Sequence, residues 1–314
     1  MPKVFVIGAL LPTGGAYMAY HVGRLLHRHF GYELYDVEMS KPDRQLFEYD
    51  APAITVSLEK MEGLVTPDDI LIVNPSYSEN LFGLRLPCRK IMYAQGFRKF
   101  LVLDCYCDLY VSVSQMVSQH IHTLFGISSP VIPAFAQVRQ MPETIPWHDR
   151  PPGSILTWIK DGSNDLMSVT RVLHKTLQMK APDIDITNVL DGRELDREDF
   201  LKKIGSVRYL LNLSLAEGFG LIPLEAMAMG TTVIGLDGLG GRDYMQNGTN
   251  CLVESMTSLD KLPDTIIRAV RDEALAYQCA QRGHFTSRHY SHMAFKHAWL
   301  QQLALFLGRA PEHA

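Results

Sequence analysis

The chain opens with a strand, a glycine-bearing loop, a helix and a second strand, and this order restricts the fold more than any other feature. The segment reads KVFVIGALLPTGGAYMAYHVGRLLHRHFGYELYDVEM, with strands expected over 4–9 and 33–37 and a helix over 16–29. Gly31 is expected to end that helix. A helix between two strands joins them in parallel, so the sequence predicts a parallel sheet covered by helices.

Two series of alternating strands and helices are expected, one after the other along the chain. In the first, further strands are expected over 70–73, 90–93, 109–113 and 131–132. In the second, strands are expected over 154–159, 184–189, 207–213, 232–236 and 251–253, and helices over 165–179, 197–204, 222–229, 241–246 and 259–278. The sequence therefore predicts two doubly wound α/β domains. Their expected bounds are 1–140 and 154–285, with a proline-containing linker over 141–153 and a closing helix over 286–314.

The composition excludes several classes of protein. The 314 residues carry 30 Lys and Arg against 34 Asp and Glu, and this balance does not favour nucleic acid as a partner. The longest apolar runs have the length of strands, so neither a membrane span nor a signal peptide is expected, and a cytoplasmic location follows as the default. Five cysteines without a C-x-x-C pair indicate reduced core thiols rather than disulfides or a zinc site.

The segment AEGFGLIPLEAMAMG, at 216–230, places Glu217 and Glu225 at the start of an expected helix. The N–H groups at a helix start suit a diphosphate, and neighbouring glycines let a ligand approach the backbone. Carboxylates repel phosphate, but they accept hydrogen bonds from vicinal hydroxyl groups. A ligand with both a diphosphate and diols is a nucleotide sugar. The alternative is that the glutamates only stabilise the helix dipole.

A second glycine loop, DGLGGRDYMQNG, follows the strand expected over 232–236. If the two strands are neighbours, both loops face one ligand. Taken separately, each loop is also explained as a tight turn from a strand into a helix.

Over 217–253 the sequence EGFGLIPLEAMAMGTTVIGLDGLGGRDYMQNGTNCLV resembles the retaining glycosyltransferases of family 4. The resemblance is fainter over LLPTGGAYMAYHVGRLLHRHFGYEL. It implies the GT-B fold, in which two Rossmann-like domains face a central cleft. It also implies transfer of a sugar from a nucleotide-diphosphate donor to an acceptor hydroxyl, with retained configuration, without a metal or a further cofactor, in glycan or glycolipid biosynthesis. The acceptor stays open between a glycan, a lipid-linked molecule and a small molecule, with at most peripheral contact to the inner face of a membrane.

The resemblance also implies roles for individual residues. Glu225 is expected to hold the ribose, and Glu217 to act at the transferred sugar. Lys160 is expected to act as a catalytic cation at the diphosphate, although a solvated lysine at a strand end is the alternative. The remaining donor-binding residues implied are Gly218, Phe219, Gly220, Leu221, Gly240, Gly241 and Arg242. Gly14, Gly15 and His21 are expected on the acceptor side.

Two of these residues, and one basic cluster, have a second interpretation. Arg242 would otherwise be an exposed helix-start arginine, and His21 an exposed residue of a helix surface. The basic residues Arg85, Arg89, Lys90, Arg98 and Lys99 either touch anionic lipid or form a solvated face.

Departures from the family pattern keep two other functions open. The second lysine that the family places at the diphosphate has no counterpart, and Asp243 stands where the family has a glutamate. These changes leave room for a GT-B-like binding or regulatory subunit without turnover. A nicotinamide-dependent oxidoreductase is the other rival, but the loop from Gly8 to Gly15 lacks G-x-G-x-x-G spacing.

Overall fold

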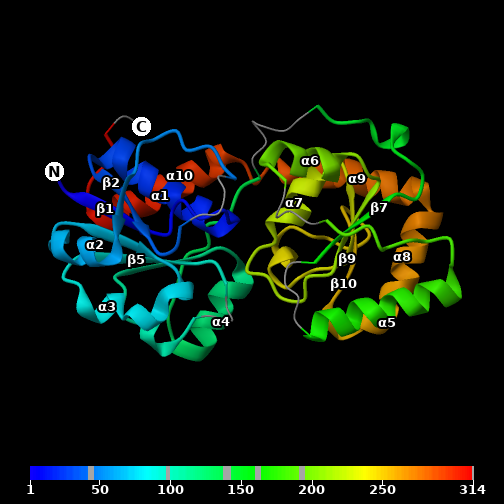
Figure 1. Ribbon diagram of the computed structural model, residues 1–314, viewed down its shortest axis with the longest axis horizontal. Coiled ribbons are helices and arrows are strands. Elements are labelled where there is room, and N and C mark those ends of the chain that lie inside the picture. The colour runs from blue at the N-terminus through cyan, green and yellow to red at the C-terminus, as the bar shows by residue number, and fades with distance from the viewer. Residues whose placement is uncertain (42–45, 97–99, 137–142, 160–163, 191–194, 313–314) are drawn as a thin grey trace. The chain divides into compact units, whose positions relative to one another are not determined.

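The structure is a computed structural model that describes residues 1–41, 46–96, 100–136, 143–159, 164–190 and 195–312. The chain forms two compact units (Figure 1). Unit 1 comprises Met1–Ala134 and Met293–Ala314, and unit 2 comprises Phe135–His292. Within the residues described, no helix is both long enough and apolar enough to cross a membrane.

Unit 1 is built on a parallel sheet of six strands. In chain order these are β1 (Lys3–Ile7), β2 (Glu33–Glu38), β3 (Ile54–Ser57), β4 (Ile70–Val73), β5 (Arg89–Ala94) and β6 (Leu109–Ser112). Their order across the sheet is β3-β2-β1-β4-β5-β6. This order reverses direction between β1 and β4, and it is the order of a Rossmann fold.

The helices of unit 1 cover this sheet. They are α1 (Gly14–Phe30), α2 (Leu58–Leu64), α3 (Phe82–Arg85), α4 (Gln115–Phe125) and α10 (His292–Leu307). Gly31 ends α1 as expected, in the left-handed conformation with φ 71°, which glycine adopts without steric cost. The C-terminal helix α10, drawn in red and orange in Figure 1, lies beside α1. It buries Trp299 with its ring 5.1 Å from that of Tyr93 on β5.

Unit 2 contains a smaller parallel sheet with the order β10-β9-β8-β7. The strands are β7 (Ile155–Trp158), β8 (Tyr209–Asn212), β9 (Thr232–Leu236) and β10 (Leu252–Glu254). The helices are α5 (Asn164–Lys180), α6 (Arg197–Gly205), α7 (Leu221–Ala228), α8 (Leu262–Arg271) and α9 (Glu273–Ser287). The two doubly wound domains that the sequence predicts are thus confirmed.

Several individual expectations need correction. The segment expected as a strand over 184–189 pairs with β7 only at Val189, where Thr157 donates to the carbonyl of Asn188. The single helix expected over 259–278 is two helices, because the Asp272 side chain accepts from the N–H of Leu275 and starts α9. Strand β3 was not expected from the sequence.

A buried arginine ties the start of unit 2 to its sheet. Arg150 is 2% exposed and donates to the carbonyls of Ile145, Val207 and Met229 at 2.7–2.9 Å. Its guanidinium also donates to Thr231 Oγ1 at 2.8 Å. Burial lowers the pKa of Arg150 to about 10. Hydrogen bonds to four acceptors offset part of the cost of burying this charge.

Replacing Arg150 with methionine should therefore destabilise unit 2. Arg150→Met leaves three carbonyls and a hydroxyl buried without their donor, and at roughly 1 kcal/mol each the free energy of unfolding should fall by about 3–5 kcal/mol. Urea denaturation followed by tryptophan fluorescence measures this change. Arg282→Met, on an exposed position of α9, is the control and should change stability by less than about 0.5 kcal/mol. Equal effects of the two substitutions would contradict the role of Arg150.

Candidate functional site

The two glycine loops of unit 2 follow neighbouring strands. β8 and β9 pair in parallel, with Asn212 beside Gly235. The loop with Glu217 follows β8, and the loop with Gly240 follows β9. Because the carboxyl ends of parallel strands share one edge of a sheet, both loops lie where open α/β sheets bind ligands. The expectation that these loops adjoin is confirmed.

The loops are joined by direct backbone pairing. Glu217 forms a parallel bridge with Leu239, and its N–H donates to the carbonyl of Gly238 at 2.7 Å. In return, the N–H of Gly240 donates to the carbonyl of Glu217 at 3.1 Å. A Cβ on Gly240 would lie 2.2 Å from the carbonyl oxygen of Gly218, so only glycine allows this approach. The Gly240 amide is thus engaged within the protein, and its contact with a diphosphate stays a prediction.

The turn after β9 is held by Asp237. Its carboxylate accepts from the N–H of Leu239 at 2.9 Å and from Arg242 Nε at 2.7 Å. Leu239 has the backbone angles φ 66° and ψ −61°, which are uncommon for a residue other than glycine. Such strain persists only where the surroundings enforce it, and it is frequent at functional sites. Arg242 is exposed, as the alternative interpretation expects, and it pairs with Asp237. Its contact with a diphosphate stays a prediction.

Three aromatic rings pack against one another at the two loops. Phe219 is buried, with its ring 5.3 Å from that of Tyr244 and 5.6 Å from that of Tyr290. The Tyr244 hydroxyl donates to the carbonyl of Gly220, and the Tyr290 hydroxyl donates to the carbonyl of Asp243 at 3.1 Å. Burial raises the pKa of Tyr244 well above its ordinary value, and the Glu217 carboxylate adds to this effect. Sequence reasoning did not find either tyrosine.

Both glutamates are buried, and they differ in their surroundings. Glu217 is 6% exposed and lies in the paired loop itself. Glu225 is 3% exposed on α7, and both of its carboxylate oxygens accept from the guanidinium of Arg197. Arg197, at the start of α6, also lies over the ring of Phe200, at 5.8 Å. The sequence offered one signal for Arg197, since a cation at a helix start is unfavourable unless a carboxylate compensates it.

The start of α7 has no side-chain cap. Gly220 is its N-cap residue, with φ 85°, and a glycine has no side chain to accept a hydrogen bond from the first turn. Leu221 is the first helical residue. Two polar atoms at the ends of neighbouring strands, Ser214 Oγ and Trp158 Nε1, are buried without a hydrogen-bond partner in the described part of the chain. Buried polar atoms are usually paired, so these two are exceptions among the described residues.

The expected acceptor-side residues lie in unit 1. Gly14 and Gly15 begin α1, after Thr13, whose hydroxyl accepts from the N–H of Ala16 at 3.2 Å. His21 is 6% exposed, with the rings of Tyr17 at 4.5 Å and Phe295 at 6.4 Å. The interpretation of His21 as a surface residue is therefore wrong, because α10 covers this face of α1. Lys160 lies outside the described residues.

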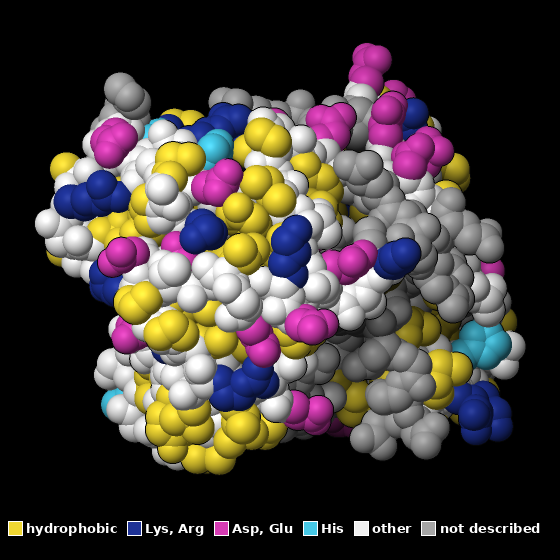
Figure 2. Space-filling model, turned by 60° about the vertical axis from the view of Figure 1, so that its left-hand side comes forward, with side chains coloured by type: hydrophobic (Ala, Val, Ile, Leu, Met, Phe, Trp, Pro, Cys, Tyr) yellow, Lys and Arg dark blue, Asp and Glu magenta, His cyan; other side chains and the backbone are white. Residues whose placement is uncertain are grey.

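The described residues of the basic cluster of unit 1 each have a contact within the protein or are buried. Arg85 pairs with Glu62, Arg89 lies over the ring of Phe306 at 3.7 Å, and Lys90 is 7% exposed. Arg98 and Lys99 lie outside the described residues. On the face drawn in Figure 2, acidic and basic side chains are interspersed rather than gathered by sign.

Comparison with known proteins agrees with this geometry. Residues 195–284, which include both glycine loops and Glu225, match the family model of glycosyl transferases group 1. No curated protein sequence matches the chain significantly.

Solved structures resemble the chain over nearly its whole length. Sucrose-phosphate synthase from Thermosynechococcus elongatus is 12% identical with a TM-score of 0.70, over 98% of this chain and all of the other. Anabaena HepE in complex with UDP-glucose is 11% identical with a TM-score of 0.72, over 97% of this chain and all of the other. The lipopolysaccharide outer core galactosyltransferase WaaB is 15% identical with a TM-score of 0.65, over 98% and 100% of the two chains. The fold is GT-B.

The paired loops make Gly240 sensitive to substitution. A Cβ in Gly240→Ala would meet backbone atoms of Gly218 and Glu217 at 2.2–2.6 Å, so the loops must separate. We expect the free energy of unfolding of unit 2 to fall by about 1–3 kcal/mol, as in other overpacked positions, measured by urea denaturation. Gly63→Ala in α2, where a Cβ meets nothing within 4 Å, is the control and should be neutral or stabilising. An unchanged Gly240→Ala protein would show that the loops tolerate separation.

Proposed function

We propose that the protein is a glycosyltransferase that takes a sugar from a nucleotide-diphosphate donor and transfers it to an acceptor hydroxyl with retained configuration. The observation that carries this proposal is the pairing of Glu217 with Leu239, which brings two glycine loops and a buried carboxylate to the carboxyl edge of one sheet. The family match over residues 195–284 supports it. We place the activity in the cytoplasm, in glycan or glycolipid biosynthesis.

The donor diphosphate fits the start of α7. Its uncapped N–H groups and partial positive charge attract phosphate, and Gly218 and Gly220 present no side chain. Stabilising the diphosphate as it leaves is the main electrostatic task of such a reaction. We expect Lys160 to add a positive charge there. Ser214 Oγ and Trp158 Nε1 offer further hydrogen-bonding atoms at the same edge of the sheet.

The ribose is assigned to Glu225, and Arg197 prepares this carboxylate. A buried carboxylate without a cation would be costly, and the two-pronged contact with Arg197 offsets that cost. The contact also fixes the plane of the carboxylate. Its remaining lone pairs can then accept hydrogen bonds from the two ribose hydroxyls. Arg197 is thus a positioning residue in this proposal.

Glu217 is assigned to the transferred sugar. It belongs to the paired loop, so its backbone position is fixed by hydrogen bonds on both sides. A fixed carboxylate can accept hydrogen bonds from sugar hydroxyls and stabilise positive charge that develops on the sugar as the bond to the diphosphate breaks. The acceptor hydroxyl attacks on the face that the diphosphate leaves, which retains the configuration.

UDP is the first probe, because HepE was solved with UDP-glucose. A UDP concentration of 100 times the dissociation constant should stabilise the protein by about 2.7 kcal/mol in a thermal-shift experiment. Slow hydrolysis of a nucleotide sugar would then separate an enzyme from a binding subunit. If no nucleoside diphosphate or nucleotide sugar shifts the melting temperature, the proposed function is wrong.

Substitution of the two glutamates should have different effects on binding and turnover. Glu225→Gln weakens hydrogen bonds to the ribose, so the affinity for nucleoside diphosphate should fall by about 1.5–3 kcal/mol. Glu217→Gln should leave that affinity nearly unchanged and lower turnover, because its contact strengthens in the transition state. Calorimetry with the nucleoside diphosphate and transfer kinetics measure the two effects.

The matched control is Glu198→Gln on the exposed side of α6, where Glu198 pairs with Lys202. It should change neither binding nor turnover. Normal binding and turnover in both Glu225→Gln and Glu217→Gln would reduce the glutamates to stabilisers of a helix start.

Transfer should not depend on a divalent cation. The proposed site uses helix N–H groups and lysine and arginine side chains where other transferases use a metal to hold the diphosphate. Dialysis against a chelator should therefore leave the rate of transfer unchanged. Loss of activity that manganese restores would count against this part of the proposal.

A further inference from the structure

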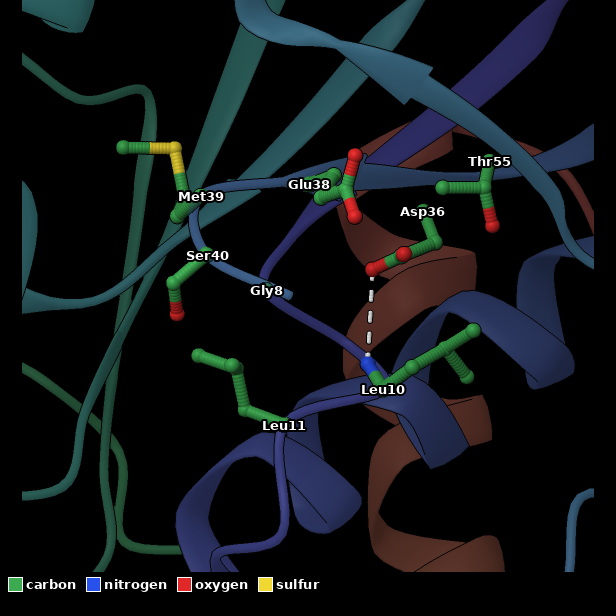
Figure 3. A pocket seen from close by; sticks show the side chains of 8 residues that line it. All are labelled: Gly8, Leu10, Leu11, Asp36, Glu38, Met39, Ser40 and Thr55. Carbon is green, nitrogen blue, oxygen red and sulfur yellow. Dashed lines mark hydrogen bonds between the residues drawn. The ribbon is translucent and has the colours of Figure 1, made fainter. Parts of the chain in front are cut away.

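Unit 1 contains a cavity of about 140 Å³ at the carboxyl ends of β1 and β2, lined also by Thr55 of β3 (Figure 3). This is the edge at which an open α/β sheet binds ligands. The carboxylates of Asp36 and Glu38 line one side of the cavity, and Thr55 and Ser40 contribute hydroxyl groups. The donor site proposed above lies in unit 2 and uses none of these residues.

The two carboxylates lie on the same face of β2, because alternate residues of a strand point to the same side. Asp36 is 4% exposed, accepts from the N–H of Leu10 at 3.3 Å, and stands in register with Thr55 of β3. The side chain of Glu38 is half-buried, and its carboxylate makes no hydrogen bond or ion pair among the described residues. The cavity is thus lined by one carboxylate that the protein holds and by one without a partner in the described part of the chain.

The opposite wall is apolar. Leu10 and Leu11 come from the loop after β1, and Figure 3 shows both beside Gly8. The hydroxyl of Tyr77 lies 3.1 Å from the position that a Cβ of Gly8 would take. The lining of the cavity therefore combines hydrogen-bond acceptors with apolar groups. A sugar ring has the matching surfaces, since its hydroxyl groups donate hydrogen bonds and its C–H faces are apolar.

We propose that this cavity binds a single sugar ring, whose neighbouring hydroxyl groups donate to Glu38 and Asp36 and whose C–H face packs on Leu10 and Leu11. The volume limits the ligand to one ring that the cavity encloses only in part, because a protein cavity of about 150 Å³ holds benzene and a hexose is larger. As a statement that the acceptor is a sugar, the proposal rests on the proposed function. As a binding site, it stands on unit 1 alone.

A nicotinamide dinucleotide fits this edge less well, although the strand order and an acidic residue at the end of β2 are those of dinucleotide-binding domains. Such a ligand needs the start of α1 for its diphosphate. There the Thr13 hydroxyl already caps the helix, and Gln95 Nε2 donates to the carbonyl of Gly15 at 2.8 Å. The Gln95 Oε1 atom lies 2.2 Å from the position of a Gly15 Cβ. Side chains of the protein thus occupy the place of the diphosphate.

Saturation-transfer NMR on the full chain tests the site. The probes are the methyl glycosides of glucose, galactose and N-acetylglucosamine, with tetrahydropyran as a ring without hydroxyl groups. We expect at least one glycoside to bind, with a dissociation constant on the order of millimolar, and tetrahydropyran to give no signal. Glu38→Gln should weaken that binding at least fivefold, because it removes charge-assisted hydrogen bonds. Ser40→Trp, which fills the cavity from its exposed rim, should abolish it.

Glu59→Gln, on the exposed side of α2, is the control and should bind the glycoside like the unchanged protein. The melting temperature of each variant shows that it is folded. The proposal is overturned if no glycoside binds, if Glu38→Gln and Ser40→Trp bind as well as the control, or if the cavity variants abolish binding of NADH instead. Because UDP binding is measured separately, its absence with sugar binding retained contradicts only the proposed function.

Discussion

The backbone pairing of Glu217 with Leu239 is the constraint from which the rest of the unit 2 site follows. It requires glycine at 240, because the carbonyl of Gly218 occupies the space of a side chain. It also holds Leu239 in an uncommon conformation, which Asp237 secures through a hydrogen bond. The result is a pair of loops that backbone hydrogen bonds hold to each other. A loop held in this way loses less conformational entropy when it binds, so more of the binding energy is available for specificity.

Buried charge is the second constraint, and unit 2 meets it in two ways. Glu225 faces the guanidinium of Arg197, so its negative charge is matched by a cation. Among the described residues Arg150 has no such partner, and it instead donates to backbone carbonyls and a hydroxyl. The first arrangement leaves a carboxylate ready to accept more hydrogen bonds, whereas the second uses four donors of the guanidinium for the fold. This difference separates a residue suited to function from one suited to stability.

The sequence predicts those parts of the molecule that depend on local patterns. The strands that became β4 and β9 were expected with their observed bounds, because each is a continuous apolar run between turn residues. The edge strand β3 lacks such a run, and Ile54 is 44% exposed, so no hydrophobic signal marks it.

The residues of the site likewise differ in whether a local sequence pattern predicts them. Both glycine loops and both glutamates were expected, since they lie within a single segment of the sequence. Arg197 and Tyr290 come from other helices and from the chain end of unit 2, and only the tertiary fold brings them to the loops. Long-range contacts of this kind leave no periodic pattern in a single sequence.

The position of α10 has a consequence for synthesis. Its residues belong with unit 1, yet they follow all of unit 2 along the chain. A ribosome therefore completes the second unit before it makes Trp299 and Leu303, two fully buried side chains of the first. Until then the face of α1 near His21 and the ring of Tyr93 lack their cover. The unit that is translated first is thus completed last, and an apolar face of it stays uncovered during that interval.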